Sequence, residues 1–315
     1  MRKVGLIGCG HVGATVALDI VQGGLVDELV IIDKKREKAE AEVLDLLDAL
    51  SLLPFYIKIY VGEYTDLVNA DIILSTLGHI ELIKPGGDRF TELKANIPEI
   101  KEVSEQLNRI NFKGILIATT NPNDVIVNLY SQLLNLPQSH IIGTGTYLDT
   151  ARMKAQVSKA LKIDGRAIEG YVLGEHGNSQ FTAWSTVRVG GQSFLEIAKE
   201  KNLDLEDLEE KARQGGFAVF NTKGYTNVAI AAATVSLMNL VLSDAKSITI
   251  CSHYDEKFKS YISTPALIGK EGVEALVKFP LTFEEEVKLK QSVCEIQEKI
   301  CLLYTSDAAD EGLGV

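Results

Sequence analysis

Residues 3–13 read KVGLIGCGHVG, and this stretch decides the fold of the chain. The apolar run at 3–7 is typical of a buried strand, and the amphipathic pattern that follows the stretch is typical of a helix. Between the two, Gly8, Gly10 and Gly13 form a G-x-G-x-x-G turn. A glycine turn that joins a strand to a helix in this way predicts a unit that binds a dinucleotide.

Each glycine of this turn has a separate predicted task. The first permits a tight turn, the second lets the backbone approach a pyrophosphate, and the third lets helix and strand pack closely. The helix N-terminus supplies N–H groups and positive potential for the phosphates. Asp33, twenty residues after Gly13, can accept hydrogen bonds from the adenosine ribose and would repel a 2′-phosphate, which favours NAD over NADP. The alternative is a cluster of turn glycines without a ligand.

The rest of the first half repeats the same rhythm of apolar runs and amphipathic stretches. Further short β-branched runs lie at 29–32, 57–61, 71–76, 115–118 and 141–142. Strands buried on both faces read as continuous apolar runs, and parallel strands need helical crossovers such as 36–50. Residues 1–142 are therefore predicted to form an α/β domain with a doubly wound parallel sheet, the Rossmann arrangement.

After residue 142 the pattern changes to that of an α+β domain, residues 143–300. We expect helices at 146–161, 205–223 and 228–243, and strands at 167–173, 183–189, 247–251 and 259–262. A last helix is predicted to begin near Thr282, with Glu285 completing a capping box. Its apolar stripe comprises Leu289, Val293, Ile296 and Ile300. The tail, 301–315, resembles a translated cloning adapter; the alternative is a frayed native terminus.

Composition excludes several classes of function. Thirty-two basic and 43 acidic residues give a net charge of −11, which disfavours nucleic-acid binding. No apolar run reaches the ~18 to 20 residues of a membrane helix, and no signal-peptide pattern precedes the glycine turn. The four cysteines are widely spaced and form no metal-binding pair, so we expect reduced thiols, a cytoplasmic protein and no metal site.

Two further patterns carry titratable groups. Asp149 and Arg152 stand three residues apart, which places them on one face of a predicted helix. The alternative for this pair is an ordinary surface ion pair. His176 lies between glycines in the sequence Gly-Glu-His-Gly, where the backbone can pack closely around a ligand. The alternative for a single histidine is a structural role.

Taken together, the motifs of this chain resemble those of the L-lactate and malate dehydrogenase family over residues 3 to 300. They occur in the family's order: the glycine turn, Asp33, GGDR at 86–89, TNP at 120–122, LDTAR at 148–152, GEHG at 174–177 and KGYT at 223–226. STLG at 75–78 and the stretch 174–189, with Asn178 and Gln180, look like the L-2-hydroxyisocaproate dehydrogenase branch. The resemblance implies an NAD-dependent L-2-hydroxyacid dehydrogenase that forms a homodimer or homotetramer.

The resemblance also implies roles for the titratable groups in hydride transfer between NADH and a 2-oxo acid. His176 would be the general acid in reduction and the base in oxidation, since an imidazole titrates near working pH. Asp149 would fix the ring tautomer and favour its protonated form. Arg152 would hold the substrate carboxylate as a bidentate pair, which a lysine could not orient.

A second group of implied residues surrounds the reacting carbonyl. Arg89 would lie on a lid over 79–90 and polarise the carbonyl as negative charge grows on its oxygen. Asn121 would donate to the substrate oxygen and border the nicotinamide, and Gly78 would contact the cofactor. The alternative for the lid is an ordinary connection that happens to contain an arginine.

Position 83 bears on the choice of substrate. Malate dehydrogenases resemble one another in carrying an arginine there, and lactate dehydrogenases tend to carry glutamine, whereas this chain has Ile83. An apolar residue predicts an apolar, branched substrate such as 2-oxoisocaproate, in a pocket that Thr226 would flank. Asn178 replaces the aspartate usual in lactate dehydrogenases. The alternatives are L-lactate dehydrogenase, L-malate dehydrogenase and, from a different class, a non-catalytic NAD-binding protein.

Overall fold

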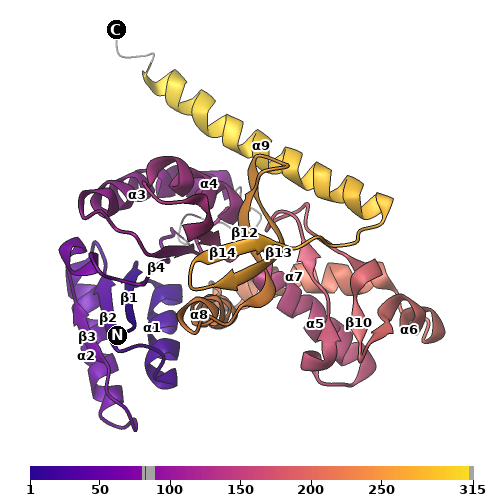
Figure 1. Ribbon diagram of the computed structural model, residues 1–315, viewed down its shortest axis with the longest axis horizontal. Helices are drawn as coiled ribbons and strands as arrows, with labels where there is room; N and C mark the ends of the chain where they lie inside the picture. The colour runs from indigo at the N-terminus through magenta and orange to yellow at the C-terminus, as the bar shows by residue number, and fades with distance from the viewer. Residues whose placement is uncertain (80–81, 83–88, 312–315) are drawn as a thin grey trace.

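The computed structural model describes residues 1–79, 82 and 89–311 (Figure 1). Six parallel strands from the first half lie side by side in the order β6-β5-β4-β1-β2-β3. Their bounds are β1 Lys3–Ile7, β2 Glu28–Ile32, β3 Lys58–Val61, β4 Ile72–Ser75, β5 Ile115–Ala118 and β6 Ile141–Gly143. This order is that of a doubly wound dinucleotide-binding sheet. The predicted fold class is confirmed, and each strand lies within one residue of its predicted position.

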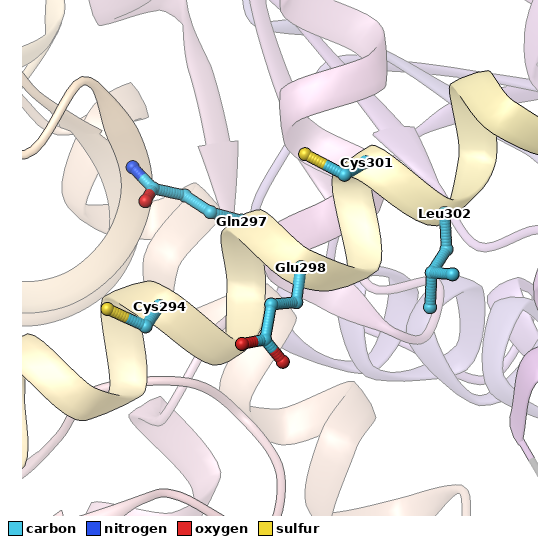
Figure 2. Close-up of a pocket in the computed structure, with 5 residues that line it drawn as sticks. All are labelled: Cys294, Gln297, Glu298, Cys301 and Leu302. Atoms are coloured by element: carbon cyan, nitrogen blue, oxygen red, sulfur yellow. The ribbon is translucent and has the colours of Figure 1, made fainter.

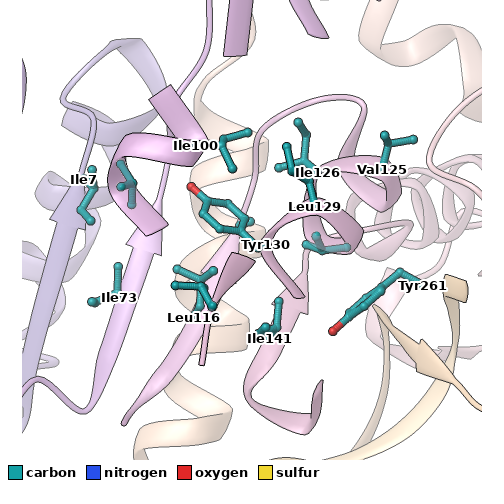
Figure 3. Packing of buried hydrophobic residues seen from close by; sticks show 14 of the residues in the cluster. Ile7, Ile73, Ile100, Leu116, Val125, Ile126, Leu129, Tyr130, Ile141 and Tyr261 are labelled. Carbon is teal, nitrogen blue, oxygen red and sulfur yellow. The ribbon is translucent and has the colours of Figure 1, made fainter. Parts of the chain in front are cut away.

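Helices cover both faces of this sheet because successive strand residues point to opposite sides. Leu6, Ile31 and Leu74 pack with α1 (His11–Gly23), α2 (Arg36–Leu50) and α8 (Val228–Leu242). The strand residues between these, whose side chains point to the other face of the sheet, pack with α3 (Arg89–Arg109) and α4 (Asn123–Leu133). Figure 3 shows this second core, where Tyr130 of α4 lies among Ile73, Leu116 and Ile100. Strands with apolar residues on both sides are therefore fully buried.

The second half extends the same sheet with antiparallel strands. β12 (Ser247–Asp255) pairs with β6 at Ser252 and Gly143, and β13 (Ser260–Gly269) and β14 (Gly272–Leu276) follow outward. The sheet therefore has nine strands among the described residues. β14 was not among the sequence predictions. The extension matters for the site because it places Ser252 beside the residues that follow β6.

A smaller core holds the remaining elements together. It contains buried residues of α5 (Tyr147–Leu161), α6 (Phe194–Glu200) and α7 (Leu205–Lys223). The predictions for α5 and α7 are confirmed, and α6 was not predicted. Short strands complete this region: β7 Ile168–Glu169, β8 Val172–Leu173, β9 Phe181–Thr182, β10 Arg188–Val189 and β11 Gln192–Ser193.

Two predicted strands in this region, 167–173 and 183–189, are wrong as continuous elements. The first is split into β7 and β8, which belong to different sheets. Gly170 separates them with a φ of +130°, and a Cβ there would lie 2.7 Å from the side chain of Val187. The second is interrupted by a 3-10 turn at Trp184–Thr186. Apolar composition alone did not reveal these turns.

The last helix, α9, spans Phe283–Glu311 and begins with the predicted capping box. The Thr282 backbone N–H donates to Glu285 at 2.9 Å, and the Glu285 backbone N–H donates to the Thr282 hydroxyl at 3.3 Å. Leu289, Val293 and Ile296 of its apolar stripe are buried. The helix continues through the first part of the predicted tail to Glu311, over residues that include no proline or glycine. Whether residues 301–315 are native stays a prediction.

Candidate active site

The glycine turn has the geometry that a pyrophosphate site needs. Gly8 has a φ of +94°, and a Cβ on Gly13 would lie 2.0 Å from the Gly8 carbonyl oxygen, so both positions require glycine. A Cβ on Gly10 would meet nothing within 4 Å. Gly10 is the N-cap of α1, and no side chain caps that helix. The open space and the uncapped helix N-terminus fit the phosphates of a dinucleotide.

Asp33 lies beside this turn, at the end of β2. Its Oδ2 accepts a hydrogen bond from the Cys9 backbone N–H at 2.6 Å, and its Oδ1 accepts one from the Lys35 backbone N–H at 2.8 Å. The Gly8 N–H donates to the Ile32 carbonyl at 2.8 Å, which holds the ends of β1 and β2 together. The carboxylate is therefore fixed next to the glycine turn, where an adenosine ribose would lie.

Loops from two further strands complete this edge of the sheet. The Thr76 hydroxyl, after β4, donates to the Gly8 carbonyl at 2.5 Å, and the Thr120 hydroxyl, after β5, donates to the Leu77 carbonyl at 2.8 Å. Gly78 is exposed in the loop after β4. Asn121, half-buried after β5, accepts a hydrogen bond at its carbonyl from Asn96 at 3.2 Å. These predicted residues all follow the carboxyl ends of parallel strands, where ligands bind in such sheets.

A contact that the sequence did not predict joins the two halves of the chain at the glycine turn. His11, the first residue of α1, stacks on Tyr225 with ring centroids 3.7 Å apart and an interplanar angle of 3°. Asn227 donates to the Thr15 hydroxyl at 2.8 Å. Both second-half residues come from the link between α7 and α8, and half-buried Thr226 lies between them. The KGYT motif marked Tyr225 in the sequence, but it did not predict which residue Tyr225 would contact.

The predicted acid–base and carboxylate-binding residues are brought together around one carboxylate. Asp149 Oδ2 lies 2.5 Å from Nδ1 of His176, and Asp149 Oδ1 accepts a hydrogen bond from Nη1 of Arg152 at 3.0 Å. The Asp149 side chain is 3% exposed, whereas those of His176 and Arg152 are 18% and 20% exposed. The buried carboxylate therefore fixes two side chains that remain accessible.

The electrostatics of this group follow from its contacts. Burial raises the pKa of Asp149, but the charges and hydrogen bonds of His176 and Arg152 outweigh it and hold the pKa below its usual value. Asp149 is therefore an anion at neutral pH. An anion on Nδ1 selects the tautomer that presents Nε2 to a reactant and stabilises the imidazolium form.

The loop that contains His176 is held by residues of α4 and α9 that sequence reasoning missed. Asp124, in the first turn of α4, accepts the His176 backbone N–H at 2.8 Å. Glu175 is buried and forms an ion pair with Lys299 of α9. The Glu175 backbone N–H donates to the Ser292 hydroxyl at 2.6 Å. The GEHG motif therefore packs on α4 and α9, and no pattern in the sequence pointed to these distant partners.

The side chains of two predicted site residues lie outside the part of the chain that the structure describes. Ile83 lies outside the described residues, as does most of the predicted lid over 79–90. Arg89 begins α3, and its side chain is likewise outside the described part. Their roles stay predictions.

A groove of about 560 Å³ lies along α9 (Figure 2). Its lining residues all come from this helix: Cys294, Gln297, Glu298, Cys301 and Leu302. Cys294 and Cys301 are exposed, while Cys9 and Cys251 are buried thiols, and all four are unbridged. The groove contains none of the residues predicted to bind cofactor or substrate.

Comparison with known families and proteins agrees with this geometry. Residues 2–143 match the model of the NAD-binding domain of lactate/malate dehydrogenases, and residues 146–304 match that of the α/β C-terminal domain. An L-lactate dehydrogenase of Fervidobacterium nodosum is 36% identical over 306 residues, covering 95% of this chain and 97% of the relative.

Solved structures agree as well. A lactate dehydrogenase from a Medee basin deep-sea metagenome library has a TM-score of 0.90 at 32% identity, covering 95% of this chain and 98% of its own. A lactate dehydrogenase of Cryptosporidium parvum, complexed with lactic acid and nicotinamide adenine dinucleotide, has a TM-score of 0.90 at 25% identity. That comparison covers 96% of this chain and 98% of the other. None of the helices in the described residues is both long and apolar enough to span a membrane.

Proposed function

The chain belongs to the lactate/malate dehydrogenase family, and we propose that its substrate is an apolar, branched 2-oxo acid such as 2-oxoisocaproate. It is an NAD-dependent oxidoreductase that acts on a CH–OH group. The observation that carries the catalytic part of the proposal is the carboxylate of Asp149, which contacts His176 and Arg152 through its two oxygens. A protein that only bound NAD would need neither contact.

The chemistry divides between the cofactor and the chain. NAD, when bound, supplies or accepts the hydride. The glycine turn would hold its pyrophosphate and Asp33 its adenosine ribose, while Gly78 and Asn121 would border the nicotinamide. His176 would transfer a proton through Nε2 between itself and the substrate oxygen, because its Nδ1 is occupied by Asp149.

Arg152 would bind the substrate carboxylate. Only Nη1 of its guanidinium is engaged with Asp149, and a guanidinium carries five N–H donors. The remaining donors can form a two-point contact that orients the substrate. Asn121 and Arg89 would donate to the carbonyl oxygen, where negative charge develops during reduction.

Specificity for an apolar side chain rests on Ile83 in the sequence. A second carboxylate beside it would be desolvated without a partner, which costs several kcal/mol, whereas each buried methylene gains about 0.8 kcal/mol. Thr226 would flank the same pocket. L-Lactate dehydrogenase is the second candidate, because the relatives named above carry that activity in their names.

A panel of substrates separates these candidates. Initial rates of NADH oxidation are measured with 2-oxoisocaproate, phenylpyruvate, pyruvate and oxaloacetate. We expect kcat/KM to be highest for 2-oxoisocaproate, lower for pyruvate and lowest for oxaloacetate. A preference for pyruvate would assign the chain to the lactate branch, and efficient oxaloacetate reduction would contradict the argument from Ile83. Failure of all four, with NADH bound, would favour a non-catalytic protein.

We also propose two features of organisation. The boundary between the NAD-binding and substrate domains is placed between residues 142 and 143, where parallel β6 leads toward α5. The functional unit is a homodimer or homotetramer, supported by apolar side chains of α2, α7 and α8 that one chain leaves exposed: Leu44, Leu47, Val219 and Val228.

A further inference from the structure

A second buried carboxylate lies behind His176, on the backbone side of its loop. Asp124 is 1% exposed and stands in the first turn of α4. Its Oδ2 accepts the His176 backbone N–H at 2.8 Å, and its Oδ1 accepts the Ser252 hydroxyl of β12 at 2.5 Å. Each carboxylate oxygen thus has a donor, which is the arrangement that an ionised carboxylate needs when it is buried.

The charges around Asp124 are asymmetric. Glu175 is a neighbouring acid, but its own charge is met by Lys299 of α9. Asp149 lies on the far side of His176, against the ring, and is partly balanced by Arg152. Burial, the largest effect, raises the pKa of Asp124, hydrogen bonds from Ser252 and His176 lower it, the charge of Glu175 raises it and that of His176 lowers it. The net result is a pKa raised to about 6, so the carboxylate is mostly ionised at neutral pH. His176 is thus the cationic partner of Asp124 among these groups.

We propose that Asp124 is a positioning residue for the reaction: it anchors the backbone of His176 and adds a second negative charge that favours the imidazolium form. The proposal rests on the acid–base role proposed for His176. The anchor and the ring contact act at two points, so the imidazole cannot pivot away from the substrate while Asp149 holds Nδ1. The charge acts in the same direction as that of Asp149, because an anion nearby stabilises a cation.

A purely structural role predicts a different behaviour. If Asp124 only tied α4 to β12, its replacement by asparagine would lower stability and leave the titration of His176 unchanged. Removal of a nearby negative charge, by contrast, shifts the ring toward its neutral form at a given pH. The titration of the ring therefore distinguishes the two roles.

The first test reads that titration without requiring enzyme activity. Diethyl pyrocarbonate modifies only neutral imidazole, so the rate of modification of His176, followed by peptide mass, reports its protonation as pH rises. In Asp124→Asn we expect the midpoint to fall by about 0.5 to 1 pH unit. Glu28→Gln is the matched control, since Glu28 is a buried carboxylate bonded to Lys3 and Tyr60. An unchanged midpoint in folded Asp124→Asn would overturn the proposal.

Kinetics provide the second test. Asp124→Asn is expected to lower kcat for 2-oxo acid reduction about 10- to 100-fold, with NADH affinity within twofold of wild type. The alkaline limb of its kcat profile should move to lower pH, because the imidazolium is the acid in reduction. A wild-type rate and profile in the folded variant would refute the role of Asp124. If the wild-type chain did not reduce 2-oxo acids, the proposed function would fail. The modification test would still decide the role of Asp124, because it does not require activity.

Ser252→Ala keeps the proposal testable if Asp124→Asn does not fold. Without the hydroxyl, Oδ1 of Asp124 loses its donor and the carboxylate takes up a proton more readily. We expect the midpoint of His176 modification to move in the same direction by a smaller amount. No movement in Ser252→Ala, with the protein folded and Asp124→Asn unfolded, would count against the electrostatic role.

Discussion

At the residue scale, the site depends on a carboxylate that uses both of its oxygens. Asp149 contacts the histidine ring with one oxygen and the arginine with the other, and it is almost wholly buried. Replacement by asparagine would leave the shape nearly intact but remove the charge and offer an N–H to one partner. In the proposed mechanism, Asp149 would therefore couple proton transfer to substrate orientation, because it contacts both the histidine and the arginine.

His176→Asn should lower kcat for 2-oxo acid reduction by about 10² to 10⁴, because the proton donor is removed. Asp149→Asn should lower it as well, through loss of tautomer control and of imidazolium stabilisation. NADH affinity, measured by fluorescence titration, should stay within about twofold in both variants, since the glycine turn is untouched. Near-normal turnover in His176→Asn would mean that another group moves the proton.

At the same scale, Asp33 is the residue proposed to determine cofactor choice. We expect NADH to be preferred over NADPH by more than about tenfold, or 1.4 kcal/mol, because a 2′-phosphate would face this carboxylate. Asp33→Ser should narrow the ratio of the two kcat/KM values. A preference of the wild-type chain for NADH over NADPH below tenfold would contradict the role proposed for Asp33.

At the residue level, the sequence predicted contacts where the partners are close in the chain or belong to a recognisable motif, while the roles given to these residues stay predictions. Asp149 and Arg152 stand three apart on one helix turn, and the GEHG motif marked His176. Asp124 was missed because its partner is 52 residues away and an Asp after Asn-Pro-Asn reads as a helix start. The stack of His11 on Tyr225 was missed for the same reason: its members come from opposite halves of the chain.

At the scale of elements, the central strands were predictable because burial on both faces demands continuous apolar runs. The helices α2 and α7 were predicted at their observed bounds, since each has a clear amphipathic period. The short strands around Gly170 were not, because a two-residue strand carries almost no periodic signal. Which sheet such a strand joins is decided by turns, and the turn at Gly170 shows itself only in its φ.

β12 contains a buried titratable group that makes folding depend on pH. His253 is fully buried, with Nδ1 near the Cys251 carbonyl at 3.0 Å and Nε2 near the Thr264 hydroxyl at 3.2 Å. Burial lowers its pKa from 6.5 to about 4. The unfolded chain therefore binds a proton that the folded chain refuses between these values, so stability is complete above pH 6.5 and falls as the pH approaches 4.

The loss attributable to His253 across that window is about 3 kcal/mol. Urea unfolding at a series of pH values should show a smaller loss in His253→Gln, whose side chain stays neutral. His140→Gln serves as a control, because His140 is only half-buried, beside the carbonyls of Lys113 and Gly114. Parallel pH curves for wild type and His253→Gln would show that other groups govern acid unfolding.

At the scale of the whole molecule, both halves of the chain contribute strands to the nine-stranded sheet, and both contribute residues to the proposed site. β12 joins β6 at Ser252, and the same serine reaches Asp124, so the second half supports residues of the first. Tyr225 and Asn227 contact α1 beside the glycine turn. The sequence predicted two domains by their composition, but it could not show that strands of one extend the sheet of the other.

The exposed apolar surface of α2 leads to a prediction about assembly. Leu44 and Leu47 stand three residues apart, so they share one face of the helix, and they are 63% and 42% exposed. Burying a leucine side chain gains about 1.5 to 3 kcal/mol, so the pair favours a contact that covers it. We expect the mass in solution, by light scattering coupled to size exclusion, to be two or four times 34.4 kDa.

Leu44→Asp with Leu47→Asp should weaken that assembly, because association would then bury two unpaired charges in place of apolar groups. The mass should move toward that of one chain as the protein is diluted from about 100 μM to 1 μM, a range in which a two-state dimer with a weakened interface dissociates. Leu52→Asp is the control, since Leu52 is 86% exposed just beyond the end of α2. An assembly that persists unchanged in the double variant would place the interface on another face of the molecule, with α7 and α8, which carry Val219 and Val228, as the next to examine.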